Sequence, residues 1–111
     1  MSHIYLFVRS DLSVSQQIIQ TSHAVDQLVR FLRLPLKKSV DNMVLFSVDS
    51  EIELLRVSSY LNDKYVHHHT FFEPDVEQFT AIATEPLSGS RRELMKNFNL
   101  KKEPEQCISG Y

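Results

Sequence analysis

The segment 8-VRSDLSVSQQIIQTSHA-24 determines the fold expected for this chain, because it contains a strand end, a turn and a helix start in succession. It follows an apolar run at residues 4–8 that lacks polar alternation, which is typical of a strand covered on both faces. Ser13 and Gln16 have the spacing of a capping box, which satisfies two backbone N–H groups at a helix start. The segment therefore predicts a buried strand that turns directly into a helix.

Two stripes distinguish the faces of this predicted helix. Residues three or four apart form an apolar stripe that we expect to pack on a sheet: Val14, Ile18, Thr21 or Ser22, Val25, Leu28, Val29 and Leu32. The same spacing counted from Gln16 collects polar side chains, namely Gln20, His23, Gln27 and Arg30. We therefore expect His23 to be accessible to solvent.

Three further apolar runs, at residues 43–48, 65–72 and 79–84, predict strands. The last strand should be antiparallel to its neighbour, because only a short turn at Pro74 and Asp75 separates the two. Helices are expected after the first, second and last strands. The order β-α-β-α-β-β-α predicts an α/β fold, a three-layer α/β/α sandwich on a four-stranded mixed sheet.

The capping-box spacing recurs later in the chain, at Ser50 with Glu53 and at Ser90 with Glu93. The first of these predicts a helix that ends near residue 62, and the second predicts a short helix near the end of the fold. If the second and third strands flank the first on opposite sides, the first two helices cover opposite faces of the sheet. A crevice then opens at the carboxyl end of the first strand, beside Arg9 and Asp11.

The composition suits one compact domain, since the chain has 111 residues, of which 42% are hydrophobic. We expect the domain to occupy residues 1–100 and a flexible tail to occupy residues 101–111. The net charge of −2 excludes a uniformly basic nucleic-acid-binding surface. Basic residues nevertheless form two clusters, which fit either a local phosphate-binding patch or ordinary charges at helix ends. The first cluster is Arg30, Arg33, Lys37 and Lys38, and the second is Arg91, Arg92, Lys96, Lys101 and Lys102.

The expected compartment is the cytoplasm. The chain has one cysteine, Cys107, which excludes an internal disulfide and fits a reducing environment. The early apolar run follows no basic region and meets Arg9 directly, so it does not have the pattern of a secretory signal. No apolar stretch approaches the roughly 20 residues that a membrane span needs, and we expect no membrane contact.

Two sequence segments resemble the class II peptidyl-tRNA hydrolases. Residues 9–12, RSDL, followed by residues 20–24, QTSHA, are similar to the R-x-D-L and Q-x-S-H-A segments of that family. Residues 72–75 and 78–83 resemble the acidic loop and last strand of a short, phage-like or bacterial branch of the superfamily. The similarity spans residues 3 to 100. It implies the same α/β fold, with the last strand antiparallel, and an activity on peptidyl-tRNA.

The chain also departs from the pattern of active members of that family. Those proteins carry a Lys- and Gly-rich insert between the D-L pair and the helix, whereas residues 13–17 read SVSQQ and contain no lysine. Their D-A-G-R-T-like loop before the last strand is replaced by EPDVE at residues 73–77. The resemblance therefore implies the fold more directly than it implies the activity.

The resemblance implies roles for particular side chains. Asp75 or Asp11 would orient or deprotonate water and His23 would polarise the ester or shuttle a proton, which makes these three the candidate catalytic residues. Gln20 and Thr80 would position the ester carbonyl. Arg9 is the remaining candidate substrate-binding residue, as a replacement for the missing lysine. No cofactor is implied.

Ordinary structural roles remain open for the same residues. Asp11 follows a strand at a helix N-terminus, where a carboxylate stabilises the helix, and Asp75 lies in a Pro-Asp turn for which Asp is a common choice. Glu73 and Glu77 flank that turn, and paired carboxylates in one cleft can raise a pKa enough for one to act as a base. Residues 67–69 are consecutive histidines, but without a further ligand at suitable spacing they favour exposed strand histidines over a metal site.

Two functions are compatible with these observations. The first is a metal-independent hydrolase that cleaves the ester between a peptide and tRNA. The second is a catalytically inactive binding module of the same fold that holds tRNA, a peptide or a protein partner. The absence of the family's lysine separates the two, because a developing oxyanion and a terminal phosphate both require a cation unless Arg9 substitutes. Assembly as a homodimer is left open.

Overall fold

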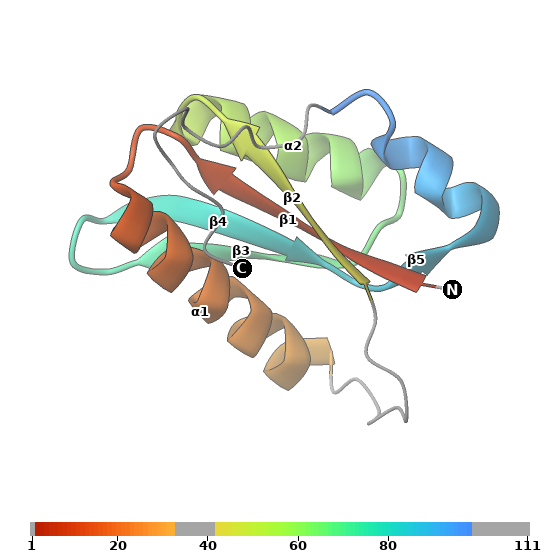
Figure 1. Ribbon diagram of the computed structural model, residues 1–111, viewed down its shortest axis with the longest axis horizontal. Helices are drawn as coiled ribbons and strands as arrows, with labels where there is room; N and C mark the ends of the chain where they lie inside the picture. Colours follow the sequence, from red (N-terminus) through yellow and green to blue (C-terminus); the bar gives the residue numbers. More distant parts are fainter. Residues whose placement is uncertain (1, 33–41, 99–111) are drawn as a thin grey trace, which may run out of the picture.

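The fold is a mixed α/β arrangement of five strands and three helices, described by a computed structural model for residues 2–32 and 42–98. Four strands lie side by side in the order β2-β1-β4-β3, and the fifth strand, β5, pairs with β1 without being part of this order (Figure 1). β1 pairs in parallel with β2 and antiparallel with β4, and β3 pairs antiparallel with β4. The strands are β1 (Ser2–Arg9), β2 (Asn42–Val48), β3 (His68–Glu73), β4 (Gln78–Thr84) and β5 (Leu87–Ser88).

The two long helices begin where their caps are expected. The helices are α1 (Val14–Leu32), α2 (Glu51–Asp63) and the 3₁₀ helix η1 (Gly89–Met95). The Ser13 hydroxyl accepts a hydrogen bond from the backbone N–H of Gln16 at 3.2 Å. The Ser50 hydroxyl accepts one from the backbone N–H of Glu53 at 3.3 Å. Both predicted starts, of α1 and of α2, are therefore confirmed, because in each case a serine oxygen satisfies an N–H group that the helix itself leaves unpaired.

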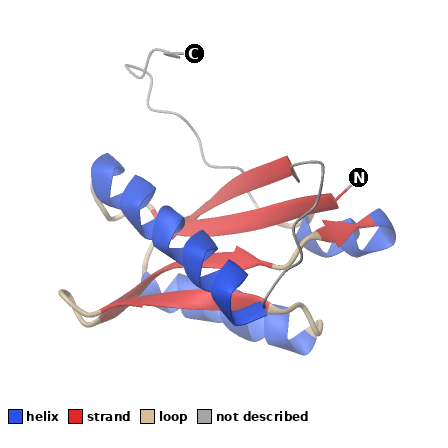
Figure 2. Cartoon of the chain, turned by 90° about the horizontal axis from the view of Figure 1, so that it is seen from below, coloured by secondary structure: helices blue, strands red, loops and turns tan. Residues whose placement is uncertain are grey.

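Side chains alternate along β1 between two buried clusters, one on each face of the sheet. Tyr5 and Phe7 pack in the cluster that contains the buried residues of α2, whereas Ile4, Leu6 and Val8 pack with Ala24 and Leu28 of α1. The two long helices thus cover opposite faces, as Figures 1 and 2 show. This arrangement follows from the strand order, because β2 and β3 lie on opposite sides of β1.

The sheet contains one strand more than the sequence predicted. β5 is only two residues long, and it pairs antiparallel with the beginning of β1. Leu87 within it is buried in the α2-side cluster. A two-residue strand has no periodicity from which it could be recognised in the sequence.

Two further boundaries differ from the prediction because of backbone conformation. β3 begins at His68 and not at residue 65, since Tyr65 has a φ of 57° and lies in a turn. The last helix begins after Ser88 and is a 3₁₀ helix, and Gly89 at its first position has a φ of 59°. That conformation suits glycine, whereas the predicted cap at Ser90 lies inside the helix.

The predicted core-facing stripe of α1 is confirmed at Leu28 and wrong at Val14, Ile18 and Val29. Val14 and Ile18 are exposed by 59% and 62%, while the residues that α1 buries completely or nearly so are Gln17, Gln20, Ala24 and Leu28. The sheet beneath α1 presents Thr80, Ala81 and Ala83, whose small side chains allow the helix to approach closely and leave little volume for large apolar groups. The helix is therefore turned so that glutamines, not valines and isoleucines, face the sheet.

Several predictions lie outside the described residues. These are the tail at 101–111 with Cys107, and part of each basic cluster: Arg33, Lys37, Lys38, Lys101 and Lys102.

Candidate functional site

The carboxyl end of β1, the first turns of α1 and the turn between β3 and β4 lie at the same end of the molecule (Figure 1). The candidate residues from the sequence are found in these segments. Four of them form two separate hydrogen-bonded pairs, Arg9 with Asp11 and Gln20 with Thr80. His23 contacts the second pair's surroundings by stacking on Phe71, and Asp75 does so through its backbone N–H.

Arg9 forms a clamp between the end of β1 and the start of β4. Its Nε and Nη2 donate to the two carboxylate oxygens of Asp11 at 2.9 and 2.8 Å. Its Nη1 donates to Oε1 of Gln78 at 2.7 Å and to the carbonyl oxygen of Phe79 at 3.1 Å. The side chain is consequently almost fully buried, with only 7% of the residue exposed. A bidentate arginine–carboxylate pair of this kind fixes geometry as well as charge.

The clamp shifts the pKa values of both partners. The hydrogen bonds from Arg9 lower the pKa of the Asp11 carboxyl, and the same bonds raise the pKa of Arg9. Glu51, the first residue of α2, attracts the guanidinium further, so the clamp lies toward the α2 side of the sheet. Asp11 is therefore an ionised carboxylate with both oxygens engaged, an arrangement that holds the β1–α1 turn.

Gln20 is the centre of the second group, on the α1 side. Only 2% of the residue is exposed, and its amide is engaged at both ends. Its Oε1 accepts from the Thr80 hydroxyl at 2.7 Å. Its Nε2 donates to Oε2 of Glu73 at 3.0 Å and to Oε1 of Gln16 at 3.2 Å. One buried amide thus joins α1, β3 and β4.

A β-bulge explains how Thr80 reaches Gln20. In the pairing of β3 with β4, Phe71 lies opposite Ala81 and Phe72 lies opposite Phe79, so that Thr80 is the extra residue. Regular alternation with Ala81 would direct Thr80 to the α2 side of the sheet. The bulge instead turns its hydroxyl toward α1, as bulges beside functional sites commonly do.

Glu73 and His23 complete the polar surface around Gln20. The bond from Gln20 lowers the pKa of Glu73, with smaller contributions from the backbone N–H of Asp75 and from the charge of His23. Oε1 of Glu73 accepts that N–H at 3.2 Å, which places the Asp75 turn against the group. The His23 ring is exposed, as predicted, and stacks on Phe71 with centroids 4.9 Å apart. Glu73 is therefore an ionised group that is bonded both to Gln20 and to the backbone of the Asp75 turn.

The structure brings some of the candidate residues together and separates others. Gln20 and Thr80 are in direct contact, and Arg9 is paired with Asp11, but no hydrogen bond between described residues connects these two pairs. The sequence did not predict that Glu73 accepts a hydrogen bond from Gln20 or that Gln78 accepts one from Arg9. The register of β3 with β4 pairs these two residues at the end of the ladder, and this register follows from the bulge, which has no clear sequence signal.

The three consecutive histidines have separate structural partners, and the backbone N–H of His67 donates to Oε2 of Glu85 at 2.7 Å. His68 lies within hydrogen-bond distance of the Ser58 hydroxyl, at 2.8 Å, and of the Val66 carbonyl oxygen, at 2.9 Å. The His69 ring stacks on Phe31 of α1 at 4.9 Å, and its burial lowers its pKa. Within residues 2–32 and 42–98, no three histidine, cysteine, aspartate or glutamate residues are grouped to hold a metal ion.

Comparisons with known proteins identify a structure of similar fold but indicate no function. No protein-family profile matches the chain, and no curated protein matches it either. The solved structure of a protein of unknown function from Agrobacterium tumefaciens superimposes with a TM-score of 0.65 at 14% sequence identity. The match covers 91% of this chain and 98% of the other. In the part of the chain that is described, no helix combines the length and the apolar character required to cross a membrane.

Proposed function

We propose that the group around Gln20 is the active site of a hydrolase that cleaves the ester between a peptide and tRNA. The observation that supports this most strongly is the burial of Gln20 together with its bonds to Thr80 and Glu73. An uncompensated buried amide is costly, whereas a fully bonded one holds its partners in a single geometry. The residues held in this way include two from the segments that resemble class II peptidyl-tRNA hydrolases.

Acid–base chemistry at this site would be divided among three side chains. Asp75 lies in an exposed turn and serves as the base that deprotonates water, while the exposed His23 ring transfers a proton to the leaving group. Asp11 is a poor base, because Arg9 occupies its oxygens and lowers its pKa, so its role is to hold the turn. Glu73 has a lowered pKa and remains ionised, so it keeps accepting the hydrogen bonds that orient Gln20 and the Asp75 turn.

Binding of the ester carbonyl would use the bond that Gln20 can most easily exchange. Its Nε2 donates one hydrogen to Gln16, whose side chain is exposed and can move aside. The carbonyl oxygen of a substrate would then take the place of Gln16 and accept that hydrogen bond. Thr80 and Glu73 keep the amide of Gln20 oriented during this exchange, so that the donor is positioned before the substrate arrives.

A specific observation favours the alternative, a binding module without activity. Arg9 was the candidate to replace the lysine of active hydrolases, and its guanidinium is buried in the clamp with Asp11, Gln78 and Phe79. It is therefore committed to the protein and does not provide a free cation for a tRNA phosphate. A module of this kind would hold tRNA, a peptide or a protein. In either case we propose a cytoplasmic domain over residues 1–100, as a monomer or homodimer.

Single-turnover hydrolysis of diacetyl-lysyl-tRNA tests the proposal. Asp75→Asn preserves size but removes the base, and it should slow the reaction by about 10²- to 10⁴-fold. His23→Ala should also be slow and remain folded. Glu77→Gln is the matched control, because it removes one exposed carboxylate from the same turn and should leave the rate within about three-fold. Rates like that of the wild type in both Asp75→Asn and His23→Ala would contradict the assignment.

Salt-dependent binding separates the two candidate functions. A wild-type protein that retains tRNA but shows no turnover would support the binding module. Contact with a few phosphates should give a log–log slope of roughly −1 to −3 against salt concentration. Failure to retain tRNA at low ionic strength would instead indicate a peptide or protein as the partner.

A further inference from the structure

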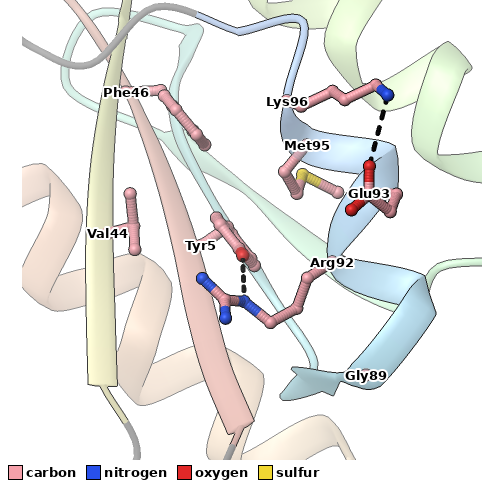
Figure 3. Close-up of a pocket in the computed structure, with 8 residues that line it drawn as sticks. All are labelled: Tyr5, Val44, Phe46, Gly89, Arg92, Glu93, Met95 and Lys96. Atoms are coloured by element: carbon pink, nitrogen blue, oxygen red, sulfur yellow. Dashed lines mark hydrogen bonds and ion pairs between the residues drawn. The ribbon is translucent and has the colours of Figure 1, made fainter.

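A second concave site lies on the opposite face of the sheet from Gln20. It is a cavity of about 380 Å³ between η1 and the β1–β2 pair (Figure 3). Tyr5, Val44 and Phe46 line it from the strands, and Met95 lines it from η1. This volume is at the lower end of the range for small-molecule sites, and the walls combine apolar side chains from the sheet with the charged side chains Arg92, Glu93 and Lys96 of the segment that contains η1.

Two hydrogen-bond donors converge on this cavity. Nε of Arg92 donates to the Tyr5 hydroxyl oxygen at 3.1 Å. The terminal nitrogens of that guanidinium have no further hydrogen bond or ion pair within residues 2–32 and 42–98. Tyr5 is only 4% exposed, and its hydroxyl acts as an acceptor in this bond, so that its own proton has no acceptor in the same part of the chain. Figure 3 shows the guanidinium and the hydroxyl side by side at the cavity.

We propose that this cavity binds a small oxyanion, a carboxylate or phosphate group, carried on a compact apolar body. The terminal N–H groups of Arg92 match two oxygens of such a group, and the Tyr5 O–H provides an additional donor beside them. The bond between Nε and Tyr5 orients the guanidinium before the ligand arrives, which reduces the entropy lost on binding. The apolar body would contact Val44, Phe46 and Met95.

Charges at the rim are compatible with an anion. Lys96 pairs with Glu93 at 3.2 Å, and both side chains are largely exposed to solvent. An exposed pair of this kind contributes little to stability, so Lys96 can turn toward a bound anion at low cost. The site does not share a residue with the group around Gln20. It is therefore independent of the hydrolase proposal, and either can fail without the other.

Titration of the folded protein with benzoate, followed by ¹H–¹⁵N NMR, tests this site. The Nε–H resonance of Arg92 reports directly on the guanidinium. Arg92→Gln should weaken benzoate binding roughly 10- to 100-fold, the usual effect of losing charge-assisted hydrogen bonds. Tyr5→Phe keeps the ring stacked on Phe46 and should weaken binding by about three- to ten-fold through loss of one neutral donor.

The matched control is Arg91→Gln. Arg91 precedes Arg92 in η1 and carries the same charge, but its Nη2 donates to the Tyr65 carbonyl oxygen and it does not line the cavity. This variant should bind benzoate within about two-fold of the wild type, since a distant surface charge has a small effect. Benzamide, which has the same shape without the charge, should bind at least about ten-fold more weakly than benzoate.

Inorganic phosphate, titrated in parallel, distinguishes the two oxyanions. Binding of benzoate, of phosphate or of both with loss in Arg92→Gln supports the proposal and identifies the preferred group. Three results would overturn it. These are no shift of the Arg92 resonance by either probe up to about 10 mM, equal binding of benzamide and benzoate, or equal losses in Arg91→Gln and Arg92→Gln.

Discussion

The two faces of the sheet are stabilised by different interactions. On the α2 side the helix buries large apolar residues, Leu54, Val57 and Leu61, against an aromatic sheet surface. On the α1 side the helix places Gln17 and Gln20 against the sheet beside Ala24 and Leu28. Hydrophobic area is thus concentrated on the α2 side, whereas directional hydrogen bonds determine how α1 is placed.

This difference indicates which side of the sheet is suited to a catalytic or binding site. A hydrophobic interface tolerates small shifts with little loss of specificity, but a buried amide with two partners fixes the positions of both. Thr80, Glu73 and the Asp75 turn all depend on Gln20 in this way. The α1 side therefore buries less hydrophobic area than the α2 side, and it has instead an ordered polar site that reaches solvent at His23.

The largest expected effect is on the α2 side. Leu61 is completely buried, and Leu61→Ala should lower the free energy of unfolding by about 2–5 kcal/mol, because it removes apolar contacts and leaves a cavity. Urea denaturation measures the change. Leu55→Ala on the same helix is the control, since Leu55 is partly exposed and should lose less than about 1 kcal/mol. Equal losses in the two variants would mean that α2 is not anchored through this face.

A smaller loss is expected for Gln20→Leu on the α1 side. The variant has similar size, but it leaves the buried Thr80 hydroxyl without its acceptor, which should cost about 1–3 kcal/mol. Adding Thr80→Val removes the unsatisfied hydroxyl as well. The double variant should therefore be more stable than Gln20→Leu alone, and additive losses in this double-mutant cycle would show that the Gln20–Thr80 bond does not organise the face.

Four of the five strands and the starts of the two long helices could be predicted from the sequence, but the orientation of α1 could not. Capping serines and apolar runs are local signals, and both long helices begin where those signals indicate. The rotation of α1 depends on the surface beneath it, where Ala81 and Ala83 leave little room for Val14 or Ile18. Periodicity treats glutamine as a polar residue and therefore predicts that it faces solvent. In the folded chain, a hydrogen-bonding partner nearby can make the burial of a glutamine favourable.

The candidate site was predicted only in part for a similar reason. The segments that carry His23, Gln20 and Asp75 do meet at one end of the molecule. The bond from Thr80 to Gln20, however, depends on a bulge in β4, and strict alternation would have assigned Thr80 to the other face. Likewise, the sequence left Arg9 available as a phosphate ligand, but in the folded chain its Nε and Nη2 donate to Asp11 and its Nη1 donates to Gln78 and Phe79.

Acidification should weaken the two sides in separate pH windows. His69, stacked on α1, has a lowered pKa, so the folded state binds fewer protons than the unfolded state just below pH 6.5. Stability that is present above this value is lost as the pH falls toward the folded pKa. Asp11 also has a lowered pKa, and its contribution is present above pH 3.8 and lost as the pH falls through its folded value.

Each of these contributions should remain below about 1 kcal/mol, because solvent screens both groups. Urea denaturation between pH 3 and 8 measures them. His69→Phe should remove only the loss near neutral pH, and Asp11→Asn should remove only the loss at low pH. If either variant abolished both losses, or if stability rose on acidification, the assignment of one titrating group to each side would be wrong.

The smallest expected effect concerns the exposed stripe of α1. Ile18 is 62% exposed, so Ile18→Gln should change the free energy of unfolding by less than about 0.5 kcal/mol. Leu28→Gln is the matched substitution on the buried side of the same helix, and it should be severely destabilising, because Leu28 is completely buried among apolar residues. The pair distinguishes the two orientations of α1, since the orientation expected from periodicity buries both residues and requires both variants to be destabilised. A loss in Ile18→Gln that depends on protein concentration would instead show that a second copy of the chain covers the stripe.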